Sequence, residues 1–261
     1  MQETNFSFEV IVHDDASTDG TTDIIKEYAS KYPLIIRPIY EEKNQFSINN
    51  HIIQRKMESA SRGKYIAWCE GDDFWIDPKK LQKQVDFLEA NPQYALCHHN
   101  MFYEKNGIRT LRIDDDIPQT QTIVELAYHN YIQTATVVFR KPAYKIVPDS
   151  MINKRTLAHF KIMRVCEQGD VYYMNEPMSV YRLHDGGIFS KKSLFEQFKM
   201  TANNISAMAA YYCDKNTQVM QALQDRLKVI YYDYLKASVK SLDVSGICKM
   251  IKYYKDRKSK I

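Results

Sequence analysis

Three carboxylates stand within four positions in the stretch WCEGDDFW, residues 68–75, at Glu70, Asp72 and Asp73. Carboxylates this close repel one another, and the aromatic residues on both sides of them make the loss of hydration costly. A positive group among the three side chains would offset that repulsion. The stretch therefore favours a bound cation, whereas the plain structural alternative is that Asp73 caps a turn and Glu70 is solvated.

Two further polar stretches have the residue types to bind a charged ligand. Asp14 and Asp15 lie in HDDASTDGTT, where they could accept hydrogen bonds from a ligand or could satisfy backbone donors and cap the next helix. Arg182 and His184 lie in YRLHDGG, residues 181–187. A guanidinium can pair with an anion and an imidazole can ligate a metal, although a lone histidine is more often structural.

Length and composition limit the classes of protein. The 261 residues suffice for one large domain or for a domain with an appendage, and 44% hydrophobic residues can build a core. The 36 basic and 32 acidic residues are too balanced to indicate nucleic-acid binding. Five widely spaced cysteines without a CxxC pair indicate neither a disulfide framework nor a zinc site. Because no apolar run has membrane-spanning length and no signal-peptide pattern is present, we expect a cytoplasmic protein.

The elements that would position the polar stretches alternate between strand and helix. Apolar runs at 8–12, 34–40 and 64–69 predict strands, and a helical pattern follows each of them. This alternation favours a mostly parallel sheet, whose ligands bind beyond the carboxyl ends of its strands. Both acidic stretches follow predicted strands, so we expect them to face one crevice. The pattern is helical from residue 193, which predicts a domain over 1–192 and a helical region over 193–261.

Three segments in order carry a resemblance to a known family. They are FEVIVHDDASTDGTTDII, then GKYIAWCEGDDFW with DPKKLQKQVDFLEANP, and finally MNEPMSVYRLHDGG. Over roughly residues 5 to 190 the chain resembles a family 2 glycosyltransferase with the GT-A fold. The resemblance implies an α/β fold with a mostly parallel, Rossmann-like nucleotide-binding sheet flanked by helices, here with a C-terminal helical appendage. It also implies an inverting transfer of a sugar from a nucleotide-sugar donor to an acceptor hydroxyl, usually with Mg2+ or Mn2+, often in bacterial surface polysaccharide assembly.

The resemblance also implies roles for the polar residues. Asp72 would be the first metal ligand, with Asp73 and Glu70 as helpers, because EGDD occupies the family's DXD-type position. Carboxylate oxygens suit a hard divalent ion that offsets charge on a departing diphosphate. Asp14 and Asp15 would contact the nucleotide base and ribose. Arg182 and His184 would lie near the diphosphate, with His184 as a further metal ligand, in a loop that Gly186 and Gly187 allow to move.

The chain departs from the family's pattern at two places. The family's catalytic carboxylate would fall near residues 157–159, where the sequence has no acid and His159 is the candidate base, with Asp149 and Asp170 as alternatives. The family's first strand and helix also precede the segment that here begins at Met1. The sequence therefore predicts a sheet that lacks an inner strand and exposes ladder groups.

The expected partners are a UDP-, GDP- or dTDP-linked sugar donor and a glycan or lipid-linked acceptor. The C-terminal CKMIKYYKDRKSKI mixes cations with tyrosines, so it could contact anionic lipid at the inner face of the membrane or could be a solvated helix end. A homo-oligomer stays open. Two rival functions also stay open: a relative that binds nucleotide or a partner without turnover, and a nucleotidyltransferase.

Overall fold

The structure is a computed structural model that describes residues 1–113, 117–141, 157–184 and 192–258. Its first sheet consists of two parallel strands in which Val10 lies opposite Ile36 and Asp14 lies opposite Tyr40. A crossover helix joins these strands and a second helix follows them, near the predicted positions: β1 (Val10–Asp14), α1 (Thr21–Lys31), β2 (Ile36–Tyr40) and α2 (Phe46–Ala60).

The second sheet has seven strands in the order β3-β8-β5-β9-β4, with β6 beside β5 and β7 beside β9. Only β5 and β9 are parallel, and the other pairs are antiparallel. The strands are β3 (Tyr65–Ala67), β4 (Phe74–Trp75), β5 (Tyr94–Lys105), β6 (Ile108–Leu111), β7 (Thr120–Gln121), β8 (Val138–Arg140) and β9 (Asp170–Arg182).

The predicted α/β class is confirmed, but the larger sheet is mixed rather than mostly parallel. One reason is a hairpin between β5 and β6, turned by Asn106 and Gly107 at φ values of 53° and 79°. This Asn-Gly pair suits a two-residue hairpin turn. A second reason is the length of β9, which continues past the predicted strand DVYYM to Arg182 and pairs antiparallel with β4.

Helices cover both faces of the larger sheet because side chains alternate along its strands. Leu96 and Val171 face α5 (Leu157–Cys166), which contributes Ile162 to the same buried cluster. Cys97 faces the opposite side, where it packs against α3 (Lys80–Ala90) through Leu88. These two layers place the core on either side of β5, β8 and β9.

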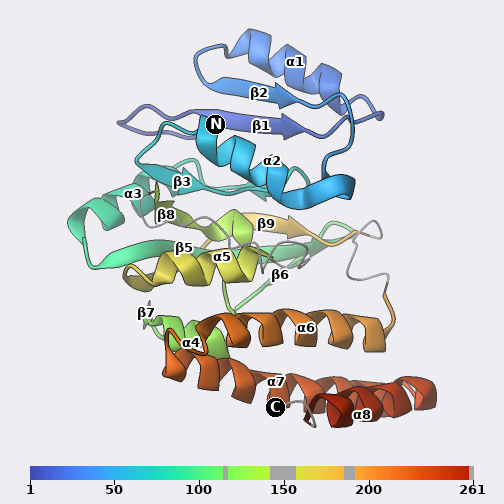
Figure 1. The fold of residues 1–261 in the computed structure, drawn as a ribbon. Helices are drawn as coiled ribbons and strands as arrows, with labels where there is room; N and C mark the ends of the chain where they lie inside the picture. Colours follow the sequence, from blue (N-terminus) through green and yellow to red (C-terminus); the bar gives the residue numbers. More distant parts are fainter. Residues whose placement is uncertain (114–116, 142–156, 185–191, 259–261) are drawn as a thin grey trace.

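From residue 193 to residue 258 the chain is mainly helical, as predicted, and packs below the sheet in Figure 1. Phe160 and Met163 of α5 share a buried cluster with Met208 and Leu223, so the helical region is docked onto the sheet. The helices that build this layer are the short α4 (Ile123–Tyr128), α6 (Leu194–Tyr212), α7 (Thr217–Lys240) and α8 (Val244–Lys258). The division at residue 192 stays a prediction. Among the residues that the structure describes, no helix combines the length and apolar character needed to cross a bilayer.

The two sheets are separate in the described part of the chain. There, β1 forms a ladder with β2 only, and β3 forms one with β8 only. Both backbone and side chains connect the two halves: the Glu3 N–H donates to the Pro78 carbonyl at 2.7 Å, and Phe6 and Phe8, just before β1, pack against the cluster that contains Leu81 and Leu88 of α3.

Candidate functional site

The acidic cluster Glu70, Asp72 and Asp73 lies in the loop between β3 and β4. Because β4 pairs antiparallel with the end of β9, with Phe74 opposite Val180, the chain after β9 returns to this loop. The structure thereby brings together five of the eight predicted site residues, three from WCEGDDFW and two from YRLHDGG.

Four hydrogen bonds hold this arrangement. The backbone N–H of Arg182 donates to Asp73 Oδ1 at 3.2 Å, and Arg182 Nε donates to the backbone oxygen of Asp72. His184 Nε2 lies 3.1 Å from Asp72 Oδ2. The Thr134 hydroxyl donates to Glu70 Oε2 at 2.5 Å. Each acid therefore has a different environment, although all three lie on one short loop.

Burial makes two of these carboxyl groups weaker acids than usual. It raises the pKa of Glu70, and it raises the pKa of Asp73 to about 6, with the neighbouring charges of Asp72 and Glu70 adding to the effect. Asp73 is 8% exposed and its Oδ2 atom is buried without a hydrogen-bond partner, whereas the Asp72 side chain is 56% exposed. An accessible carboxylate thus stands beside a buried one that has an oxygen without a hydrogen-bond partner.

The donor set fits a hard divalent cation in chemistry, since it offers carboxylate oxygens and one imidazole nitrogen. The orphaned Asp73 Oδ2 is the atom that such a cation would satisfy. Within the described residues, however, no group of three or more His, Cys, Asp or Glu side chains is gathered closely enough to hold a metal. The metal ligands Asp72, Asp73, Glu70 and His184 therefore stay predictions.

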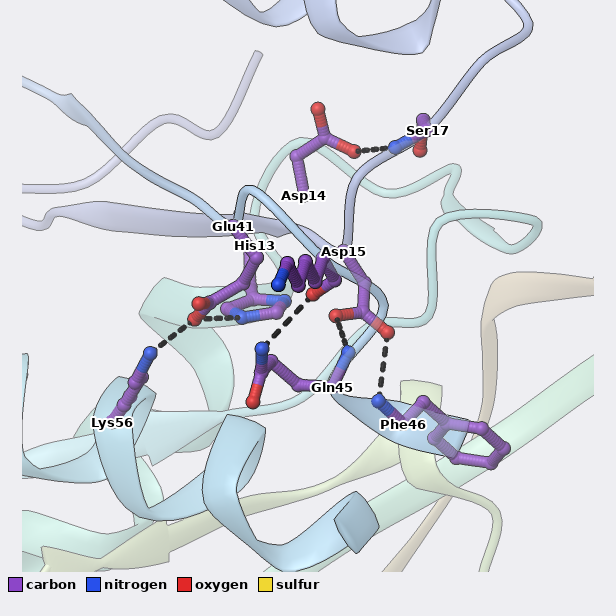
Figure 2. A network of polar contacts seen from close by, with 9 residues as sticks. His13, Asp14, Asp15, Ser17, Glu41, Gln45, Phe46 and Lys56 are labelled. Atoms are coloured by element: carbon purple, nitrogen blue, oxygen red, sulfur yellow. Dashed lines mark hydrogen bonds and ion pairs between the residues drawn. The ribbon is translucent and has the colours of Figure 1, made fainter. Parts of the chain in front are cut away.

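Asp14 ends β1 and Asp15 begins the loop after it, and both carboxylates bind the protein itself (Figure 2). Asp14 is 4% exposed and accepts hydrogen bonds from the Ser17 backbone N–H and the Thr22 hydroxyl, which lower its pKa. Asp15 accepts from the backbone N–H groups of Gln45 at 2.6 Å and Phe46 at 2.9 Å, where α2 begins. These contacts match the loop-and-cap alternative, and the predicted contacts of both residues with the nucleotide stay untested.

A polar network that sequence reasoning missed lies beside them (Figure 2). His13 Nε2 is 3.1 Å from Glu41 Oε1, and Lys56 Nζ donates to the same oxygen. These hydrogen bonds lower the pKa of Glu41. The network fixes α2 to the carboxyl ends of β1 and β2. Its sequence signal was the position of His13 and Glu41 at the ends of two parallel strands, where ligand sites usually form.

The candidate base has a different location. His159 lies on α5 with its Nε2 atom 3.3 Å from the carbonyl oxygen of Leu126, and burial lowers its pKa to about 4. Asp170 begins β9 and Arg182 ends it, so these residues are separated by roughly 40 Å of strand. The described contacts thus support neither His159 nor Asp170 as the base. Asp149, Gly186 and Gly187 lie outside the described residues.

Comparisons with known proteins identify the family of the chain. The model of the family described as glycosyl transferase family 2 matches residues 1–154. A protein of Mycobacterium tuberculosis without assigned function is 39% identical over 196 residues, covering 72% of this chain, and the chain spans 54% of that relative's length. The inferred glycosyltransferase EpsE of Bacillus subtilis is 30% identical over 236 residues, which cover 88% of this chain and 76% of EpsE.

Two further similarities concern function and fold. The Escherichia coli protein WfaP, named as a UDP-Glc:alpha-D-GlcNAc-diphosphoundecaprenol beta-1,3-glucosyltransferase, is 25% identical over 193 residues, covering 74% of this chain and 72% of WfaP. The structure of S. aureus TarS in complex with UDP-GlcNAc has a TM-score of 0.57 at 13% identity and covers 97% of this chain and 85% of that one. TarS therefore supports the fold alone. The family match, over more than half of the chain, shows that this chain belongs to the family 2 glycosyltransferases.

Proposed function

We propose that the chain transfers a sugar, with inversion, from a nucleotide-sugar donor to an acceptor hydroxyl during assembly of a bacterial surface glycan. The observation that carries the proposal is the convergence of Asp72 and Asp73 with Arg182 and His184 at one edge of the sheet. Two sequence motifs 110 positions apart meet there, and they supply both acidic and basic groups.

In this proposal the acidic cluster and Arg182 bind the diphosphate of the donor. Asp72, Asp73, Glu70 and His184 would hold Mg2+ or Mn2+, which offsets the negative charge on the departing diphosphate when bound. The Arg182 guanidinium is oriented by the backbone oxygen of Asp72 and by the Phe74 ring, 5.8 Å from its carbon. From that position it would pair with a phosphate oxygen.

Other residues position the acids. The Thr134 hydroxyl fixes Glu70, and β4 holds the loop against β9. Asp14 and Asp15 would contact the base and ribose only through lone pairs that remain after their bonds to the protein. Inversion requires the acceptor hydroxyl to attack from the face opposite the diphosphate and to lose its proton to a base. We assign no described residue to that base.

The proposed donor carries UDP, GDP or dTDP, and the proposed acceptor is a glycan or a lipid-linked sugar. The names of TarS in complex with UDP-GlcNAc and of WfaP, which specifies a UDP-sugar and a diphosphoundecaprenol acceptor, support these classes for relatives of this chain. An acceptor on a lipid carrier would place the protein peripherally at the inner face of the membrane, in the cytoplasm.

Calorimetric titration tests the donor site directly. UDP, GDP and dTDP are titrated with and without Mn2+ into the wild type, Asp72→Ala and the control Asp86→Ala, which removes an exposed carboxylate on α3. We expect Mn2+-dependent binding of one nucleotide, weakened roughly tenfold or more in Asp72→Ala because the accessible ligand is lost, and unchanged in Asp86→Ala. Failure of the wild type to bind any nucleotide would overturn the proposal.

Turnover separates the rival functions. Release of nucleoside diphosphate from a nucleotide sugar supports the glycosyltransferase, whereas pyrophosphate release from a nucleoside triphosphate would indicate a nucleotidyltransferase. The environment of His159, with its ring at a carbonyl oxygen and a lowered pKa, favours the second candidate, a relative that binds nucleotide without turnover. Metal-dependent binding without release of nucleoside diphosphate would identify that relative.

A further inference from the structure

The turn between α7 and α8 places a leucine where the backbone favours glycine. Leu242 has a φ of 57°, in the left-handed region. Its N–H donates to the Val239 carbonyl at 3.1 Å, and the next N–H, of Asp243, donates to the Ser238 carbonyl at 2.9 Å. This is the pattern of a Schellman motif, whose left-handed residue is usually glycine. A leucine there destabilises the turn because its Cβ crowds the following carbonyl oxygen.

Within the described part of the chain, no packing gain explains that leucine. Leu242 is 85% exposed, and the apolar side chains on either side of it, Val239 and Val244, are 55% and 69% exposed. The inner faces of the two helices are already buried together, through Tyr231 and Met250. We call the three exposed side chains Val239, Leu242 and Val244 the apolar tip. Their exposure to water is unfavourable, and they add nothing to the buried cluster between α7 and α8. Strain combined with exposure at one site points to a function.

Positive charge is concentrated along the two helices that meet at the apolar tip. Residues 236–261 contain eight Lys or Arg and two Asp, a net charge of +6, whereas the whole chain has +4, so the other residues are net negative. Lys236, Lys240, Lys249 and Lys252 are exposed and take part in none of the ion pairs described for the structure. The acid nearest the tip, Asp243, accepts a hydrogen bond from Gly246 N at 2.9 Å and thereby caps α8.

We propose that the apolar tip inserts into the headgroup region of an anionic lipid bilayer, with the flanking lysines bound to acidic headgroups. Exposed aliphatic side chains with exposed lysines on the adjoining helices suit such an interface. A second copy of the chain fits less well, since a symmetric pairing through this face would bring like charges together. An anionic bilayer supplies the complementary charge.

The position of the apolar tip agrees with a lipid-bound acceptor. Figure 1 shows the α7–α8 turn on the same right-hand side of the view as the carboxyl ends of β1 and β9. A bilayer held by the tip would therefore lie on the side of the molecule where the acidic cluster is found. This inference rests on the proposed function for the nature of the acceptor, but its test requires no donor, metal or turnover.

Vesicle flotation tests the inference, with the full chain and vesicles of phosphatidylcholine alone or with about one third phosphatidylglycerol. We expect the wild type to float with the anionic vesicles. Leu242→Gly should lower the bound fraction roughly tenfold, since a leucine side chain is no longer transferred from water. Its folding should be retained because glycine suits the turn, which circular dichroism verifies. The matched control is Leu34→Ser, which changes a leucine that is 91% exposed at the turn between α1 and β2 and should leave binding unchanged.

A second variant tests the charge. Lys236→Gln with Lys240→Gln should remove the preference for phosphatidylglycerol, as should high salt, because both act on headgroup attraction. Anionic-vesicle binding that is equal in the wild type and in Leu242→Gly overturns the proposal, as does a wild type that floats with neither vesicle. A dimer that Leu242→Gly dissociates, with no vesicle binding, also overturns it and assigns the apolar tip to a second copy. Because vesicle flotation requires no bound nucleotide, each of these outcomes can be interpreted even if the protein fails to bind a nucleotide.

Discussion

Lys80 is a buried amine behind the acidic loop, and its titration can be tested quantitatively. It is 0% exposed, donates to Gln84 Oε1 at 2.8 Å, and lies 4.3 Å from the centre of the Trp75 ring. Burial lowers its pKa from 10.5 to about 7. The unfolded chain therefore binds more protons than the folded one between about pH 7 and 10.5. The free energy of unfolding rises with pH through this window, and the contribution gained there is lost again as the pH falls from 10.5 to about 7.

The size of this effect follows from the difference of about 3.5 pH units between those two values. At 1.36 kcal/mol for each unit the upper limit is about 4.8 kcal/mol. The Trp75 ring favours the charged amine by up to about 2 kcal/mol at a desolvated site, so we expect about 3 kcal/mol. The titratable neighbours stay neutral through most of the window, because burial raises the pKa of Cys69 to about 11 and of Cys97 to about 12 and lowers that of His99 far below its usual value.

Urea denaturation at several pH values measures the effect. The wild type is compared with Lys80→Met and with the control Lys79→Met, whose side chain is exposed. The stability of the wild type relative to Lys80→Met should rise by about 1.4 kcal/mol for each pH unit across the middle of the window, while Lys79→Met follows the wild type. Tyrosine titration is common to all three proteins and cancels. Parallel curves for the wild type and Lys80→Met would refute the reasoning and show that the folded protein keeps this amine charged.

Three further changes have expected outcomes, each measured by chemical denaturation. Burial raises the pKa of Glu9, but its bonds to Arg37 and Arg62 outweigh this and lower it to about 2, so its contribution is present above about pH 4.5 and is lost between there and pH 2. Because those arginines are 38% and 70% exposed, Glu9→Gln should cost about 1 kcal/mol at pH 7 and nothing near pH 2; a pH-independent loss would contradict this. Asp15→Ala should cost about 1 kcal/mol through loss of the bonds to the start of α2, and an unchanged midpoint would show that those bonds contribute nothing. Leu242→Gly should stabilise the fold by about 0.5–1 kcal/mol by relieving the left-handed leucine, whereas destabilisation would mean that its side chain packs in solution.

The parts of the fold that the sequence predicted depend on local patterns. Apolar runs identified β1, β2 and β3, and the helical pattern from residue 193 identified α6, whose N-terminus is closed by a capping box of Ser193 and Glu196. Strand direction was not predictable in the same way, because hydrophobic periodicity is the same in parallel and antiparallel pairs. The Asn106–Gly107 turn was the local signal that could have corrected the prediction of a mostly parallel sheet.

The candidate site was predictable where residue type determines the contact. The acidic stretch and YRLHDGG carry complementary charges, and the structure brings them together. The partners of Asp15 were not predictable, because backbone N–H groups about 30 positions away carry no residue signature. His159 shows that a suitable residue type does not determine the contact. It lies near the expected position in the sequence, but its ring is at a backbone carbonyl instead of at the acidic cluster.

The separation of the two sheets has a consequence for hydrogen exchange. In the described structure no backbone ladder links β1 and β2 to the seven-stranded sheet, so their amides can lose protection without any bond of the larger sheet breaking. The half-buried Val12 amide should therefore exchange sooner than that of Leu96, which is 0% exposed. An opening of this kind would move the Asp14–Asp15 loop while the acidic cluster stays folded. The nucleoside half of the proposed donor site would then be the less stable half, and ligand binding should slow its exchange first.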